Sequence, residues 1–489
     1  MGEENTVSCV IIGAGPAGLA AATKLTAAKL PTTIFEASSQ VGGISKTIQY
    51  HGYRFDLGPH RFFSKSEKVN NLWNTTLGED YFVLPRLSRI YYRNQFFNYP
   101  IKPFNALLGL GFGTSLQILL SYFTARFFPS PIEDNFEQWV SNRFGKKLYS
   151  IFFKTYTEKI WGIPCVEIRA EWAAQRIKGL SLTTALKNSL FPDRRGKITT
   201  LIDNFHYPKY GPGMMYEKMA ENMQEQGGVL LNDSEVIQID HISTIVDEQQ
   251  HHQIKSIKVK SGEHIKDHAL TNCLSSMPIT DLIQRLSPSA PVEVCLAAKE
   301  LCYRSIIVVN VVMKAAHAFA DNWIYVHSPE VKLCRILNIK NWSPWMLADP
   351  EKTSLGLEYF CTEGDNLWEM SDNDLVALAL SELEKIKLGK PADCIDSLVV
   401  RVPKAYPVYD MYYAKHLKTI KDYLASFSNL QMIGRYGMFK YNNMDHSILT
   451  GLYAAENIIA GAQHDLWAVN ADQEYHEEEQ RTLNDAVSR

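Results

Sequence analysis

Apolar residues at the start of the chain follow a strand pattern, then a helix pattern, then a strand pattern again. Residues 8–12 and 32–35 are short apolar runs, and the alanine-rich stretch between them, residues 18–28, has apolar positions at helical spacing. Short runs are typical of buried strands, whereas the longer periodic stretch is typical of a helix. The order therefore predicts a βαβ unit.

The pattern changes several times farther along the chain. Residues 85–190 are mainly helical in pattern and rich in aromatic residues, with several prolines that interrupt the helices. Short strand patterns return between residues 228 and 282, and alternating strands at 301–400 surround one helical stretch at 372–388. A strand near 430–433 and a helix near 446–460 come before an acidic tail.

These patterns predict an α/β fold with more than one domain, since 489 residues are too many for one simple core. The fold class is a discontinuous Rossmann-like domain with an inserted helical domain and an antiparallel-sheet domain on the substrate side. The predicted divisions are the Rossmann-like domain at 1–85, 201–300 and 401–465, the helical domain at 86–200, the sheet domain at 301–400, and the acidic tail at 466–489.

Charge and cysteine content exclude several classes of protein. The formal net charge is -3, so the chain has no basic excess that would bind nucleic acid. Its eight cysteines are scattered and form no C-x-x-C pair, which argues against a disulfide framework and against a zinc site. The first residues lack a basic segment followed by a cleavable apolar stretch. We therefore expect a cytoplasmic protein without a metal site.

One uncharged segment requires a test for membrane contact. Residues 103–125 carry no charge, but their glycines and polar residues make a poor membrane span. From Leu116 onward, Leu119, Leu120, Phe123 and Phe127 recur at helical spacing, so that one helix face is apolar. The pattern favours packing of this face on the core. Peripheral contact with a membrane surface or a lipid-linked substrate is the alternative.

A glycine-rich turn follows the first strand and opens the helix. The glycines permit a tight turn, close approach of the backbone to a pyrophosphate, and close packing of helix on strand. The helix N-terminus supplies amides and a positive dipole end to phosphates. An acidic residue at the end of the second strand is placed to hold ribose hydroxyls. The predicted dinucleotide contacts are Gly13, Gly15, Pro16, Ala17, Gly18 and Glu36.

A second glycine pair and a D-x-G turn follow the βαβ unit. Gly42 and Gly43 precede the turn that contains Gly58 and His60. This continuation resembles the amine oxidase and protoporphyrinogen oxidase group of flavoproteins. The resemblance implies that the dinucleotide is FAD and that these four residues contact it. It also implies adenine binding through the backbone at Val236, a residue that is equally compatible with a plain core position.

Further motifs, in the same order along the chain, resemble the UDP-galactopyranose mutases, which share this flavin fold. Residues 58–60 resemble the G-P-H turn of the mutases. Arg89 and residues 99–100 resemble the arginine and the Y-P segment that follow this turn in the mutases. The K-x-W-G segment resembles residues 159–162, and the Y-R-S segment resembles residues 303–305. The late G-R and Y-x-x-M-D loop resembles Gly434, Arg435, Tyr441, Asn443, Met444 and Asp445.

The mutase resemblance implies roles for several side chains. Arg176 and Arg304, with Tyr441, would clamp the diphosphate of a nucleotide sugar, because guanidinium groups bind phosphate oxygens in pairs. Trp161 would stack on the base or the sugar, and His60 would lie against the flavin. The implied reaction converts a nucleotide-linked sugar between ring forms through reduced flavin. NAD(P)H is a candidate electron donor.

Asp445 has a predicted local role as well. It precedes apolar residues at helical spacing and is expected to cap the last helix, residues 446–460. The N-terminus of that helix would face the flavin, where a positive dipole end stabilises negative charge on the reduced ring. The late loop residues from Gly434 to Asp445 are therefore predicted to contact the cofactor.

A second function fits the N-terminal motifs equally well. An oxidase or dehydrogenase like the amine oxidases or protoporphyrinogen oxidase would use FAD to remove a hydride from a C–N or C–C bond. The arginine pair favours the mutase, because an apolar amine or tetrapyrrole offers two buried guanidinium groups no diphosphate. Exposure of those arginines to a flavin-lined cleft would separate the two functions.

Overall fold

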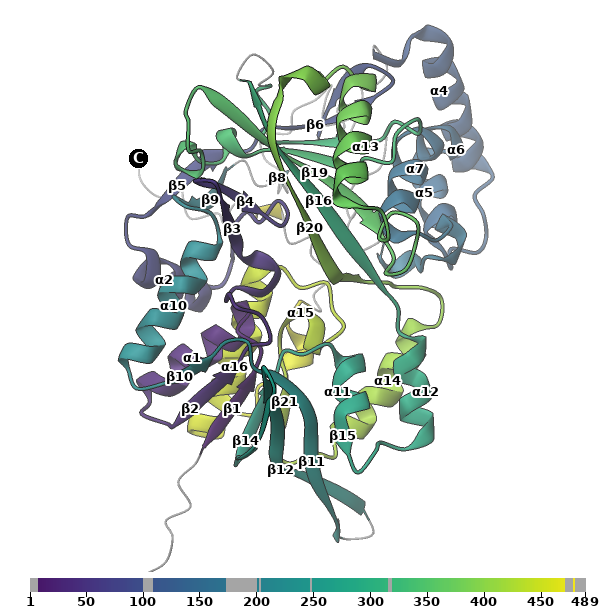
Figure 1. Cartoon of the computed structure of the whole chain (residues 1–489). Coiled ribbons are helices and arrows are strands. Elements are labelled where there is room, and N and C mark those ends of the chain that lie inside the picture. Colours follow the sequence, from purple (N-terminus) through teal and green to yellow (C-terminus); the bar gives the residue numbers. More distant parts are fainter. Residues whose placement is uncertain are drawn as a thin grey trace, which may run out of the picture.

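The computed structural model describes residues 8–99, 109–172, 200–201, 204–246, 249–314, 319–470 and 478–479. Its lower half in Figure 1 is built on a parallel sheet with the strand order β10-β2-β1-β14-β21. The predicted βαβ unit forms the centre of this sheet, so the Rossmann-like fold is confirmed. The strands are β1 (Cys9–Ile12), β2 (Thr32–Phe35), β10 (Val229–Leu231), β14 (Asn272–Ser275) and β21 (Leu430–Met432).

Helices and a second sheet surround the parallel sheet. Helix α1 (Pro16–Ala27) packs against α16 (Met444–Ala460) and α10 (Gly213–Glu225). The second sheet has the order β13-β12-β11-β15 and contains a long hairpin. Its strands are β11 (Glu235–Val246), β12 (Gln249–Ser261), β13 (His264–Ala269) and β15 (Leu286–Ser287), and the helices beside it are α11 (Ile279–Arg285), α12 (Val292–Glu300) and α14 (Tyr413–Leu424).

A seven-stranded sheet forms the upper half of the molecule, with the order β20-β16-β19-β18-β17-β6-β7. Only β6 and β17 run parallel within it. Helix α13 (Asp372–Lys385) covers one face through Leu375, Ala379 and Leu383. The strands are β6 (Ser88–Tyr92), β7 (Gln95–Asn98), β16 (Tyr303–Lys314), β17 (Trp323–Val326), β18 (Arg335–Asn338), β19 (Lys352–Cys361) and β20 (Cys394–Pro407).

A helical lobe lies beside the seven-stranded sheet (Figure 1). It contains α4 (Phe112–Phe127), α5 (Phe136–Phe144), α6 (Lys146–Tyr149) and α7 (Thr155–Trp161), with a π-helical turn at Ser150–Lys154. The remaining elements connect these parts. They are β3 (Thr47–Tyr50), β4 (Tyr53–Asp56), α2 (Glu67–Leu77), β5 (Tyr81–Pro85), β8 (Thr200–Leu201), β9 (Asn204–Pro208), α15 (Gly434–Gly437) and β22 (Glu478–Glu479).

Two predicted domain limits differ from the structure. Residues 88–98 were expected in the helical domain, but they form β6 and β7 at the edge of the seven-stranded sheet. The same sheet extends past the predicted limit at residue 400, because β20 continues to Pro407. Pairing of β6 with β17 joins residues more than 200 positions apart, so local hydrophobic periodicity could not reveal it.

Much of the uncharged segment at residues 103–125, which was tested for membrane contact, lies in helix α4 (Phe112–Phe127). The prediction that its apolar face packs on the core was wrong. Ile118 and Tyr122 are the buried side chains of this helix, whereas Leu116, Phe123 and Phe127 are exposed. Residues 103–108 of the stretch lie outside the described part of the chain. Among the described residues, no helix is long and apolar enough to cross a bilayer.

Helix packing on the parallel sheet depends on glycines that leave no room for a side chain. A Cβ atom on Gly451 of α16 would lie 2.1 Å from the carbonyl oxygen of Ala17 in α1. A Cβ atom on Gly18 would lie 2.0 Å from the carbonyl oxygen of Gly13. Both contacts are with backbone, which cannot rotate away as a side chain would. The two helices are therefore held at backbone contact distance.

This packing predicts a clear difference between two glycine substitutions in helices. Gly451→Ala should lower the free energy of unfolding by about 2 kcal/mol or more, because the added methyl group forces α16 away from α1. A Cβ atom on Gly113 of α4 would have no neighbour within 4 Å. Gly113→Ala should therefore raise the free energy of unfolding by up to about 1 kcal/mol, because alanine has the higher helix propensity. Denaturant unfolding of both variants measures the difference, and equal effects would contradict the packing described.

Candidate functional site

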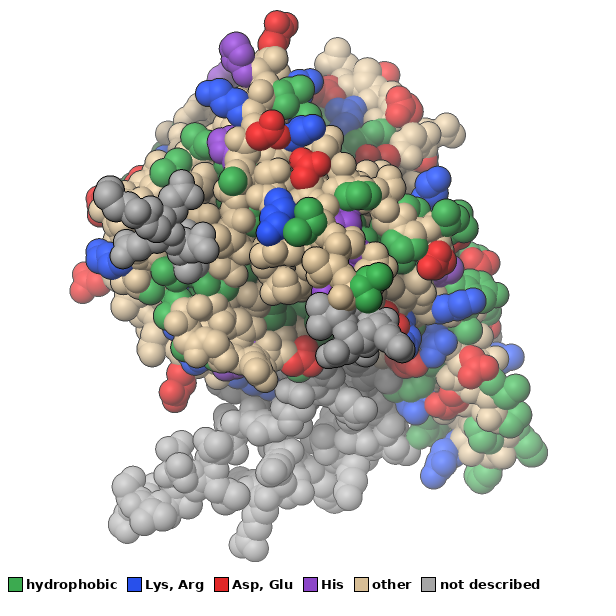
Figure 2. Space-filling model, turned by 90° about the horizontal axis from the view of Figure 1, so that it is seen from below, with side chains coloured by type: hydrophobic (Ala, Val, Ile, Leu, Met, Phe, Trp, Pro, Cys, Tyr) green, Lys and Arg blue, Asp and Glu red, His purple; other side chains and the backbone are tan. Residues whose placement is uncertain are grey.

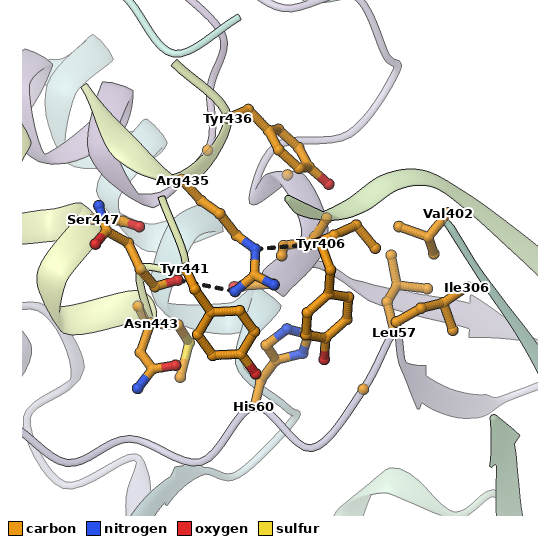
Figure 3. A pocket seen from close by; sticks show the side chains of 18 of the residues that line it. Leu57, His60, Ile306, Val402, Tyr406, Arg435, Tyr436, Tyr441, Asn443 and Ser447 are labelled. Carbon is orange, nitrogen blue, oxygen red and sulfur yellow. Dashed lines mark hydrogen bonds between the residues drawn. The ribbon is translucent and has the colours of Figure 1, made fainter. Parts of the chain in front are cut away.

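A cavity of about 690 Å³ is lined by residues of both halves of the molecule and of the helical lobe. At one end its wall is formed by the glycine turn after β1 and the end of β2. Toward the other end it is formed by aromatic residues of the lobe, by Ile306 of β16 and Arg335 of β18, and by the segment that starts α16. Figure 3 shows the part around Arg435.

The glycine turn forms a floor of bare backbone. Gly13 has a φ of 96°, which a residue with a Cβ atom rarely adopts. Gly15 is the N-cap of α1 and faces Gly43, whose Cα lies 3.9 Å from a Cβ atom built on Gly15. Gly13, Gly15, Pro16, Ala17 and Gly43 all line the cavity, whereas Gly18 and Gly42 stand behind it.

Gly42 holds the second glycine loop against the first. Its amide donates to the carbonyl oxygen of Ala14 at 2.8 Å, and its φ of 101° again suits glycine. The N-terminus of α1 therefore opens onto a groove with backbone on both sides. Such a groove fits a pyrophosphate, because amides can approach the phosphate oxygens without interference from side chains.

Glu36 directly follows β2 at the edge of this groove and lines the cavity. Its Oε2 accepts a hydrogen bond from the amide of Ala14 at 2.7 Å, and its Oε1 accepts from the amide of Ser38 at 2.9 Å. These bonds fix the carboxylate but do not exhaust its acceptor capacity. The geometry fits a role in which Glu36 accepts from the ribose hydroxyls of a dinucleotide.

Val236 lies at the far end of the groove. Its side chain is buried, and its carbonyl oxygen accepts a hydrogen bond from the Arg285 guanidinium. Arg285 also pairs with Glu235 at 2.6 Å, and all three residues line the cavity. Sequence reasoning missed Arg285, since an arginine at the end of a helix carries no distinctive signal.

Gly58 and His60 lie on the turn after β4 and line the middle of the cavity. Burial, together with the nearby charges of Arg435 and Arg335, lowers the pKa of His60 to about 3. Its Nδ1 has no hydrogen-bond partner in the part of the chain that the structure describes. His60 is therefore a neutral imidazole at physiological pH and can accept or donate one hydrogen bond toward a bound molecule.

The start of α16 differs in one detail from the sequence prediction. Asn443, not Asp445, is the N-cap, and its amide donates to Nδ1 of His446 at 3.3 Å. Asp445 lies inside the first turn, where burial raises the pKa of its carboxyl group to about 7. Asn443, Met444 and Asp445 nevertheless line the cavity together with Gly434. The N-terminus of α16 therefore opens onto the cavity.

Arg435 lies against the rings of two tyrosines at the centre of the cavity (Figure 3). Its guanidinium carbon is 4.4 Å from the ring centre of Tyr406 and 4.3 Å from that of Tyr441. Nε donates to the carbonyl oxygen of Ala405 at 2.9 Å, and Nη1 donates to that of Asn442 at 3.1 Å. Cation–π contact and backbone bonds together hold the charge in one position.

A second arginine at the cavity, Arg335, was not predicted from the sequence. Its Nε donates to Oε2 of Glu358 on the neighbouring strand, and its Nη2 donates to the hydroxyl of Tyr406 at 3.1 Å. Glu358 is fully buried, and Arg335 is almost so. Burial raises the pKa of Tyr406 to about 12, so its phenol remains a neutral donor. The sequence feature that could have identified Arg335 as a site residue is its position as a lone arginine within the apolar run 333–337.

Of the residues predicted to bind the nucleotide sugar, some line the cavity and others do not. Arg304 does not line the cavity; its Nε donates to the carbonyl oxygen of Ile160 at 3.0 Å, and its Nη1 donates to Thr362 Oγ1. Arg304 thus binds the carbonyl end of α7, where a cation is favourable. Tyr441 lines the cavity, whereas Trp161 is buried behind its wall against Trp172, at 5.0 Å between ring centres. Arg176 lies outside the described residues.

The glycine floor predicts an effect of Gly15→Val on the cofactor. A Cβ atom there has room in the protein, so the variant should fold, but its side chain would point into the space that the pyrophosphate needs. We expect purified Gly15→Val to lack bound flavin while its thermal unfolding resembles that of the wild type. Normal flavin absorbance in the folded variant would contradict this placement.

The lowered pKa of His60 predicts a pH dependence of stability. The unfolded state takes up a proton at this residue below about pH 6.5, whereas the folded state does so only near pH 3. Stability contributed by the neutral imidazole is therefore lost as the pH falls from about 6.5 toward 3. His60→Gln should unfold with a weaker acid dependence in this window, as measured by denaturant titrations between pH 4 and pH 8. An unchanged slope would contradict the neutral form.

Known proteins share the whole architecture. The crystal structure of reduced UDP-galactopyranose mutase matches with a TM-score of 0.81 at 22% identity, over 96% of this chain and 98% of that chain. A putative protoporphyrinogen oxidase from Exiguobacterium sp. 255-15 matches with a TM-score of 0.70 at 16% identity, over 94% of this chain and 100% of that chain. At these identities the likeness shows the fold alone.

Sequence comparison points to the same superfamily. Coproporphyrinogen III oxidase of Staphylococcus aureus (strain NCTC 8325 / PS 47) is 22% identical over 93% of this chain and 99% of its own length. 1-Hydroxycarotenoid 3,4-desaturase of Flavobacterium sp. (strain P99-3) is 47% identical over 53 residues, 11% of each protein. The model of the flavin containing amine oxidoreductases matches residues 16–459. The chain belongs to this family and is an FAD-dependent enzyme.

Proposed function

We propose that this enzyme converts a nucleotide-linked sugar between ring forms, as a UDP-galactopyranose mutase does. The observation that carries the proposal is the placement of Arg335, whose guanidinium lines the cavity while Glu358 and Tyr406 fix it. A guanidinium held in this way can bind an anionic group of the substrate without reorganising. The diphosphate of a nucleotide sugar supplies such a group.

The electrostatics of this part of the cavity favour an anionic substrate. Arg335 and Arg435 both line it, and the neighbouring His60 is neutral. Glu358 offsets the charge of Arg335, whereas Arg435 is held by carbonyl oxygens and tyrosine rings and not by a carboxylate. Of the carboxylates that line the cavity, Glu36 accepts from backbone amides and Glu235 pairs with Arg285. Asp281 pairs with Lys404. Burial raises the pKa of Asp445, the fourth carboxyl group in the cavity wall, to about 7. Among the described residues, the other three carboxylates of the wall therefore have partners within the protein, so a cationic amine would find little negative charge to pair with.

The chain's own residues then have distinct tasks. Arg335 would bind the diphosphate and stabilise its charge as it leaves the sugar, a role in which Tyr406 and Tyr441 would add neutral donors. Aromatic side chains of the lobe, among them Phe152, Tyr156 and Trp172, would exclude water from the sugar. When bound and reduced, FAD supplies the nucleophilic character that this type of sugar transfer requires.

A second candidate is oxidation of a carboxylated tetrapyrrole. The full-length match to coproporphyrinogen III oxidase favours it, and the arginines that suit a diphosphate also suit carboxylates. In that case bound FAD would supply the oxidising chemistry, and oxygen would be consumed with product. The two candidates agree on an anionic substrate and differ in their need for reduced flavin.

The proposal is tested by binding of UDP and UDP-galactose to the reduced enzyme under anaerobic conditions, followed by flavin fluorescence. Arg335→Gln should weaken binding by about 2–4 kcal/mol, since a charge-assisted contact in a partly desolvated site is lost. Because this variant leaves Glu358 buried without its counter-charge, the double variant Arg335→Gln/Glu358→Gln provides the second measurement. Flavin content should remain normal in both.

Arg401→Gln is the matched control. This arginine pairs with Asp372 at 2.6 Å and does not line the cavity, so its loss should leave ligand binding unchanged. Several other nucleotide sugars belong in the same series, together with coproporphyrinogen III and a measurement of oxygen uptake. Failure of every nucleotide sugar to bind the reduced wild type would exclude the mutase. Oxygen uptake with the tetrapyrrole would establish the oxidase.

A further inference from the structure

Helix α4 presents an apolar stripe to solvent at the outer edge of the helical lobe (Figure 1). Phe112, Leu116, Leu120, Phe123 and Phe127 recur at intervals of three or four positions and therefore lie on one helix face. Each of these side chains is between 47% and 87% exposed. Phe128 extends the stripe beyond the end of the helix with 81% exposure. Isolated exposed apolar residues are common, but a contiguous row of this size marks an interaction surface.

The opposite face holds α4 firmly on the lobe, so the exposed stripe is a fixed feature of the surface. Ile118 and Tyr122 are buried beneath the helix, and Ser121 Oγ accepts from the amide of Lys147 at 3.0 Å. A Cβ atom on Gly145 would lie 2.7 Å from the amide nitrogen of Tyr122. Rotation of the helix to bury the stripe would break these contacts.

The segment of the chain that carries the stripe contains basic but no acidic residues. The sequence contains no acidic residue between Asp80 and Glu133, although the whole chain has 53. Arg126 is exposed at the edge of the stripe on α4. Lys146 and Lys147 begin α6, which packs under the opposite face of the helix. Glu133 pairs with Arg143 at 2.8 Å. Figure 2 shows hydrophobic side chains among charged ones at the lower right, where the lobe projects.

We propose that the α4 stripe binds the surface of an anionic phospholipid bilayer. Exposed phenylalanine and leucine on one face, with a basic residue such as Arg126 at its edge, is a composition that binds at the boundary between headgroups and acyl chains. A helix of 16 residues is too short to cross the bilayer and would lie along its surface. The same lobe contributes Phe152 and Phe153 to the cavity wall, so binding would bring the cavity close to the membrane.

A second copy of the chain is a poorer occupant of the stripe. Symmetric self-association would place the same face of both copies together, so the Arg126 side chain at the edge of each stripe would come near that of the other copy. Like charges brought together at an interface disfavour that arrangement. Anionic lipid headgroups instead complement Arg126. The inference does not depend on which substrate the enzyme uses.

Flotation of the purified FAD-loaded enzyme with lipid vesicles tests the inference. Wild type should float with phosphatidylcholine vesicles that contain phosphatidylserine, and less with phosphatidylcholine alone or at high salt. Phe123→Ser/Phe127→Ser should reduce binding about tenfold or more, because two large apolar side chains no longer enter the bilayer. Arg126→Glu should reduce binding to the anionic vesicles only.

The matched control replaces an exposed apolar pair elsewhere. Val292 and Leu296 of α12 are 73% and 55% exposed, and Val292→Ser/Leu296→Ser should bind vesicles like the wild type. Flavin content and thermal unfolding establish that each variant is folded. Absence of wild-type binding to anionic vesicles, or equal binding by both double variants, would overturn the proposal. A stable dimer that Phe123→Ser/Phe127→Ser converts to a monomer would overturn it in favour of self-association.

Discussion

Backbone contact between α1 and α16 is the constraint on which the cofactor site depends. Gly451 leaves α16 close enough to touch the carbonyl oxygen of Ala17, and Gly18 lets α1 approach the turn at Gly13. As a result, the N-termini of both helices open onto one cavity, although they are separated by more than 400 residues in sequence. Two positive dipole ends therefore face the same cavity, where they would stabilise the negative charge of a bound dinucleotide.

The cavity has two chemically different parts. Backbone amides, glycines and Glu36 form the first part, which suits the pyrophosphate and ribose of FAD. Arginines and phenols form much of the second, where Arg435 is fixed by two aromatic rings and two carbonyl oxygens. The first part suits the cofactor of the family, whereas the second part is where a substrate would be selected. Family membership therefore leaves the substrate open.

Two arginines show that resemblance to a motif does not by itself identify the residues that line the cavity. Arg304 lies in the motif that resembles the mutases, yet its guanidinium binds the carbonyl end of α7 behind the cavity wall. Arg335 lies in no recognised motif, but its pairing with Glu358 across neighbouring strands directs it to the cavity. Each of these two residues is a lone charge within an apolar run of the sequence. Such a charge demands a partner, because burial of an unpaired ion is very unfavourable.

The sequence by itself determined the βαβ unit, the glycine turn and Glu36, and hence a dinucleotide-binding fold, because these features depend on the spacing and backbone conformation of nearby residues. The choice of FAD as the dinucleotide came from the resemblance to flavoproteins. The sequence also placed Gly434 and Asn443 in the late loop that reaches the cavity. Tertiary structure alone decided that β6 joins the seven-stranded sheet, that Arg335 meets Glu358, and that the apolar face of α4 points outward. These three features depend on strand register and on contacts between distant segments. Periodicity along the chain specifies that an apolar face exists but does not specify what covers it.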